Sequence, residues 1–80
     1  MKIELKIGEL YTSFATEILY KDCYSSSIIC TMPFNSVFCI VDYVFFKRFD
    51  SWDIKVLYEN KIGWLMRKNI WTIKHLKKVK

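Results

Sequence analysis

The 80-residue sequence is poor in several residues on which small enzymes and cross-linked domains depend, with one histidine, one proline, two glycines and three cysteines. The single histidine, His75, lies in a basic segment without an acidic neighbour. A nucleophile activated by a general base needs both partners, and no such pair is evident here. We therefore expect a protein that is not an enzyme.

The cysteines are odd in number and lack the short paired spacing of zinc sites. They fit reduced thiols better than a disulfide framework. Cys30 and Cys39 flank the turn-forming segment 33–36 and would face each other if the two adjoining strands paired, as a redox pair or half of a metal site. The simpler interpretation is that they are small buried apolar residues, and we expect no metal and no cofactor.

Long hydrophobic runs are absent as well. The longest uncharged stretch, residues 23–41, contains serine, threonine, proline and asparagine, so it does not supply the roughly 20 mostly apolar residues of a membrane span. Residues 3–7 alternate polar and apolar, unlike the apolar run of a secretory signal. We expect no membrane span and a cytoplasmic location.

Acidic residues are missing from positions 67–80, which carry six basic residues, so the net charge of +5 belongs to this segment. Lysine contacts to phosphates release counterions and aromatic rings stack on bases, which makes this segment a candidate nucleic-acid-binding surface. The alternative is a solubilising basic tail, residues 74–80, in a lysine-rich composition typical of an AT-rich genome. The candidate residues are Arg67, Lys68, Lys74, Lys77 and Lys78.

Hydrophobic residues, by contrast, make up 52% of the chain and aromatic residues 18%, enough for one domain of residues 1–80 to bury a core. Residues 37–46 form the longest β-like run and are predicted to be the central strand. One of its faces has no charge whereas the other carries Asp42, so the first is expected to point inward. The uncharged face comprises Val37, Cys39, Val41, Tyr43 and Phe45.

The segment 54–65 has the pattern of a tight hairpin. Apolar and polar residues alternate over 54–58, Glu59, Asn60 and Lys61 supply a polar reversal, and residues 62–65 resume an extended apolar run. Residues 66–69 are short enough for one 3₁₀ turn before a last strand at 70–73. The sequence thus predicts an all-β chain without a helix of ordinary length.

Several short motifs occur in order along the chain: Leu10-Tyr11, the segment 18–27 with the length of a long first loop, Ser26-Ser27-Ile28-Ile29, the turn and strand at 33–41, and 55–65 with its Gly63-Trp64 pair. In this order they resemble the bacterial-type Src homology 3 family over residues 6–74. The resemblance implies a small five- or six-stranded Src-homology-3-like barrel. It also implies that Gly63 permits close backbone approach and that Trp64 lies across the barrel or caps its core.

In this architecture a ligand is usually received between the first loop and the last turn. Tyr11, Tyr20, Trp52 and Trp71 are the candidates for an aromatic, partner-binding strip there, because aromatic rings give large contact area at low entropic cost. The structural alternative is that Trp71, like Trp64, closes a small core. Trp52 follows a polar loop and is the stronger surface candidate.

The chain departs from family members that bind proline-rich peptides. Met66, Arg67, Asn69, Ile70 and Trp71 stand where those members carry a proline and a tyrosine, which argues against that ligand. We expect a non-enzymatic interaction module that binds a protein or peptide. The alternatives are a nucleic-acid-binding barrel that uses the basic segment and, third, a cell-wall-binding module.

Overall fold

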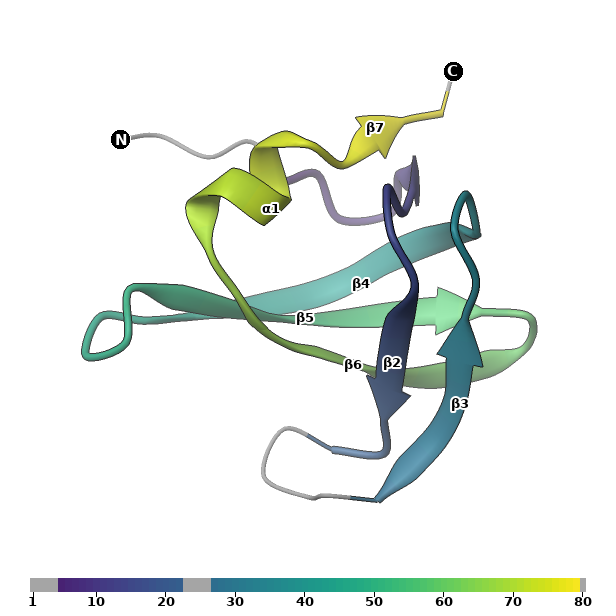
Figure 1. Cartoon of the computed structure of the whole chain (residues 1–80), viewed down its shortest axis with the longest axis horizontal. Coiled ribbons are helices and arrows are strands. Elements are labelled where there is room, and N and C mark those ends of the chain that lie inside the picture. Colours follow the sequence, from purple (N-terminus) through teal and green to yellow (C-terminus); the bar gives the residue numbers. More distant parts are fainter. Residues whose placement is uncertain (1–4, 23–26, 80) are drawn as a thin grey trace.

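The computed structural model describes residues 5–22 and 27–79. Its elements form one antiparallel sheet of seven strands in the order β3-β2-β6-β5-β4-β1-β7, curled through 183° into a half-barrel (Figure 1). The strands are β1 (Leu10–Thr12), β2 (Glu17–Tyr20), β3 (Ile28–Met32), β4 (Val37–Phe46), β5 (Ser51–Tyr58), β6 (Lys61–Lys68) and β7 (Lys77–Lys78). One short helix, α1 (Ile70–Lys74), precedes β7.

The sheet confirms the all-β prediction and corrects its details. It has seven strands instead of five or six, and it is a half-barrel that does not close. Strands β4, β5 and β6 form a meander, the β2–β3 hairpin pairs with β6, and β7 pairs with β1. Figure 1 shows the β2–β3 hairpin running across the direction of β4 and β5, with α1 and β7 at the top of the view.

The predicted hairpin is confirmed. Strands β5 and β6 are joined at Glu59 and Asn60, which both have positive φ, 47° and 64°. Two-residue turns of this kind match the right-handed twist of paired strands, and asparagine tolerates the left-handed conformation. Local turn chemistry was therefore sufficient to place this reversal.

The prediction for residues 66–73 was wrong. β6 continues to Lys68, and α1 occupies the segment expected to be the last strand. The Asn69 side chain accepts a hydrogen bond from the Thr72 backbone N–H at 2.9 Å, which caps the first turn of the helix. This cap outweighs the β preference of the isoleucine and threonine residues that follow.

Residues 74–79 are likewise more than a basic tail. They contain the end of α1 and then β7, in which Lys77 and Lys78 lie opposite Thr12 and Tyr11. The Val79 N–H donates to the Leu10 carbonyl at 2.8 Å, extending this pairing. The segment is therefore part of the sheet.

The prediction for the inward face of β4 was wrong: Val37, Tyr43 and Phe45 are exposed, and Cys39 and Val41 are only half-buried. Phe38 and Ile40, from the face assigned to solvent, are buried, and a bulge at Val41 then reverses the alternation. Beyond it, Tyr43 lies opposite the buried Ile54 but is itself 36% exposed. The absence of charge along one face therefore did not identify the buried face, and a strict period of two could not anticipate the extra residue.

One apolar core connects six of the seven strands and the helix. It brings together the lead-in segment before β1, every strand except β7, and the helix. Its members are Leu5, Tyr11, Leu19, Met32, Phe38, Ile40, Ile54, Val56, Leu65 and Ile73.

Gly63 lies where β2 crosses β6. A Cβ atom there would be 2.6 Å from Leu19 Cγ and 2.7 Å from the Tyr20 carbonyl oxygen, so only glycine fits without displacement. The predicted close backbone approach is confirmed. Trp64, the next residue, is half-buried opposite Tyr20 and Lys55, with the Lys55 ammonium 5.9 Å from its ring centroid.

Candidate partner-binding surfaces

The four aromatic residues proposed as a strip occupy different environments. Tyr11 is 4% exposed, its ring stacks on Phe38 at a centroid distance of 6.5 Å, and its hydroxyl accepts a hydrogen bond from the Lys6 backbone N–H at 3.0 Å. This ring belongs to the core and offers no surface. Among the described residues, no ring contact joins any two of the four.

Tyr20 and Trp52 are half-buried. Tyr20 lies opposite Trp64 where β2 meets β6. Trp52 packs against the core, and its ring is 4.6 Å from that of Phe45 on the neighbouring strand. Trp52 therefore stabilises the β4–β5 hairpin by packing, and only part of its surface is exposed to solvent.

Trp71 is the exposed member, with 56% of its surface accessible. It lies on α1, its ring meets Phe14 edge-on at 5.2 Å, and it lies 4.3 Å from the His75 ring. His75 Nδ1 is also 2.7 Å from the Trp71 carbonyl oxygen, within hydrogen-bond distance. These three residues, here called the Trp71 cluster, join the β1–β2 connection to the helix.

Sequence reasoning missed Phe14 and His75 as members of this cluster. Residues four apart on a helix are neighbours, so the 71/75 spacing would have indicated the contact had the helix been predicted. Phe14 reaches the helix through tertiary folding, and no local pattern identifies it. His75 is exposed, as the sequence suggested, but it packs against two rings.

A second surface lies at the end of the β4–β5 hairpin. The Phe49 ring, 53% exposed, has the guanidinium carbon of Arg48 at 5.5 Å and that of Arg67 at 5.1 Å from its centroid. Cations at such distances are attracted to the face of an aromatic ring. We call Arg48, Phe49 and Arg67 the arginine–phenylalanine cluster.

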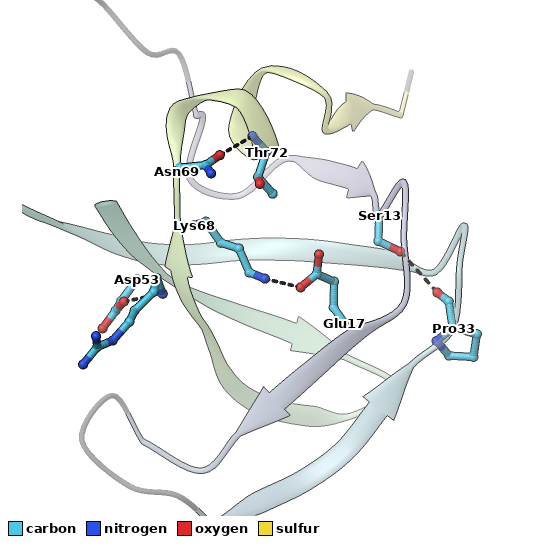
Figure 2. A network of polar contacts seen from close by, with 8 residues as sticks. Ser13, Glu17, Pro33, Asp53, Lys68, Asn69 and Thr72 are labelled. Carbon is cyan, nitrogen blue, oxygen red and sulfur yellow. Dashed lines mark hydrogen bonds and ion pairs between the residues drawn. The ribbon is translucent and has the colours of Figure 1, made fainter. Parts of the chain in front are cut away.

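The basic residues of positions 67–78 are not one continuous surface. Lys68 forms an ion pair with the buried Glu17 of β2 (Figure 2), and Lys78 lies 3.6 Å from the Glu9 carboxylate. Arg67 extends over Phe49. Lys74 and Lys77 are exposed.

The two described cysteines do not face each other, because β3 and β4 are not neighbours in the sheet. Cys30 lies opposite Leu19, whereas Cys39 lies opposite Leu10 and Leu57. Both are half-buried free thiols. Cys23 lies outside the described residues.

Within residues 5–22 and 27–79 there is no group of three or more histidine, cysteine, aspartate or glutamate side chains arranged to hold a metal ion. The same residues contain no helix long and apolar enough to cross a membrane. No protein-family model matches the chain, and no curated protein or solved structure matches it either. The fold defines a small all-antiparallel β protein with a half-barrel sheet, and its function is inferred from its own surfaces.

Proposed function

We propose that this chain is a Src-homology-3-like interaction module that binds a protein partner in the cytoplasm and performs no catalysis. The order of its elements supports this assignment. A first strand, a hairpin, a three-stranded meander, a helical turn and a short last strand follow the order of the family-like motifs in the sequence. The return of β7 to β1 adds the pairing expected of a curled sheet of this kind.

The observation that carries the proposed function is the exposed Trp71 cluster. Trp71 projects from the last turn beside Phe14, which follows the first strand, and these are the two regions between which this architecture usually receives a ligand. A large exposed ring already held by neighbouring rings loses little entropy when a partner covers it. Such a ring suits the anchor of a protein interface.

The test is affinity capture from the native cell with the wild-type chain and Trp71→Ala as baits, each with and without nuclease. We expect a protein that survives nuclease treatment with the wild type and is lost with Trp71→Ala. Phe34→Ala is the matched control, because Phe34 is 61% exposed but lies in the β3–β4 turn, outside the Trp71 cluster. Equal capture by Trp71→Ala and wild type would contradict the proposal.

Nucleic-acid binding is the second candidate, favoured by the exposed Lys74 and Lys77 near Trp71 in the chain. Its weakness is that Lys68 and Lys78 are already paired with carboxylates. The third candidate, cell-wall binding, has no observation among the described residues that favours it.

A further inference from the structure

The chain has eleven lysines but only two arginines, and both arginines converge on the Phe49 ring. They come from different parts of the sequence, Arg48 from the β4–β5 turn and Arg67 from β6. Arginine differs from lysine in its planar fork of donors, which binds a carboxylate through two parallel hydrogen bonds and stacks on aromatic rings. The two side chains that can bind a carboxylate in this way therefore lie beside the same aromatic ring.

The backbone of Arg67 is held in place by a buried carboxylate. β6 has one extra residue opposite Asp53, and Arg67 has a positive φ of 53° at this bulge. Its N–H donates to Asp53 Oδ1 at 2.9 Å, and Asp53 is 3% exposed (Figure 2). A bulge redirects a side chain out of the regular alternation, and here it accompanies the placement of Arg67 over Phe49.

The two guanidinium groups have no anionic partner among the described residues. The ion pairs of Lys68 with Glu17 and of Lys78 with Glu9 include neither arginine. Both arginine groups lie against one ring, so they are no more than roughly 11 Å apart, about one Debye length at 0.1 M salt. A bound anion would relieve their mutual repulsion and use their free donors.

The surroundings favour a peptide over a nucleic acid as the source of this anion. Val44, Phe45 and Phe49 expose apolar surface on the same hairpin. Exposed aromatic rings combined with arginine are typical of protein interfaces, in which lysine is depleted.

We infer that the arginine–phenylalanine cluster binds a carboxylate-bearing segment of a protein partner, in which acidic residues alternate with or adjoin apolar ones. Carboxylates of this segment accept hydrogen bonds from Arg48 and from Arg67, and its apolar residues cover Phe49 and Phe45. This inference rests on the proposed function in that the partner is a protein. It says that the contacting segment of the partner is acidic. It also gives the chain a second contact surface, separate from the Trp71 cluster.

The test is selection from a display library of random short peptides on the full chain, followed by affinity measurement of one enriched peptide. We expect the wild type to enrich peptides with aspartate or glutamate beside apolar residues. The double variant Arg48→Gln/Arg67→Gln should bind such a peptide about tenfold more weakly, and Arg48→Lys/Arg67→Lys should fall between, because lysine keeps the charge but not the fork.

The control is Lys21→Gln/Lys61→Gln, which removes the same charge at two exposed positions outside the cluster. It should retain the wild-type affinity. If the enriched peptides show no preference for acidic residues but do not bind Trp71→Ala, the inference is overturned and the proposed function still stands. Equal weakening in the lysine control would overturn it too. No enrichment at all, or tighter arginine-dependent binding of single-stranded RNA, would overturn both.

Discussion

A single methyl group at residue 63 would collide with the strand that crosses it. Its Cβ would approach both Leu19 and the Tyr20 carbonyl at less than 3 Å, and the carbonyl is backbone that cannot rotate away. We expect Gly63→Ala to lower the free energy of unfolding by about 1–3 kcal/mol, and Gly63→Val by more, because overpacking strains the core. Urea denaturation followed by tryptophan fluorescence measures this difference.

Gly8 provides the comparison, because a Cβ there meets no atom within 4 Å although φ is +89°. Gly8→Ala should cost about 1 kcal/mol from backbone conformation alone. An unchanged urea midpoint for Gly63→Ala would show that β2 and β6 do not approach as closely as described.

Asp53 is the residue on which the β6 bulge depends. Asp53→Ala leaves the Arg67 N–H without its acceptor, and we expect the free energy of unfolding to fall by about 1–3 kcal/mol. Asp53→Asn keeps an oxygen acceptor at the same place and should recover most of that loss. Chemical denaturation of both variants gives the comparison, and equal stability of Asp53→Ala and wild type would refute the role of this hydrogen bond.

Helix α1 has only five residues, so its end groups contribute a large share of its stability. We expect Asn69→Ala to lower stability by about 1 kcal/mol, since it removes the acceptor for the Thr72 N–H. Asn69→Ser retains a side-chain oxygen and should remain close to the wild type. Thermal unfolding tests this, and identical melting temperatures for all three chains would contradict the cap.

The Glu17–Lys68 ion pair connects β2 to β6, where these strands are otherwise paired at Tyr20 and Trp64. Because Glu17 is buried, we expect a double-mutant cycle with Glu17→Gln and Lys68→Met to give a coupling energy of about 1–2 kcal/mol. The exposed Glu9–Lys78 pair is the internal control and should give about 0.5 kcal/mol or less. Equal coupling in the two pairs would argue against a stabilising role for burial.

For the whole molecule, the distribution of charge separates the two leading functions. With two of the basic residues paired to carboxylates, we expect short single-stranded RNA and DNA to bind weakly at low salt and hardly at all near 0.15 M. Fluorescence anisotropy at both salt concentrations tests this. Sub-micromolar binding that survives 0.15 M salt and disappears in Lys74→Gln/Lys77→Gln/Lys78→Gln would make nucleic acid the partner.

The candidate surfaces were only partly predictable. Trp71 was named as a candidate from its residue type and position, but the sequence favoured Trp52 as the surface residue, whereas Trp71 is exposed and Trp52 is half-buried. Tyr11 could not be assigned correctly, since its burial depends on Phe38 and Lys6, which approach it through tertiary folding. Phe14 and the pairing of Arg48 with Arg67 had no signal along the chain, because their contacts join distant segments.

The all-β class, the extent of β4 and the reversal at residues 59 and 60 follow from local properties: β-branched and aromatic runs favour extended backbone, and a polar pair permits a left-handed turn. The bulges at Val41 and Arg67, the pairing of β7 with β1 and the half-barrel curl follow from contacts between strands. These contacts depend on which strands become neighbours, and hydrophobic periodicity within one strand contains no information about its neighbour.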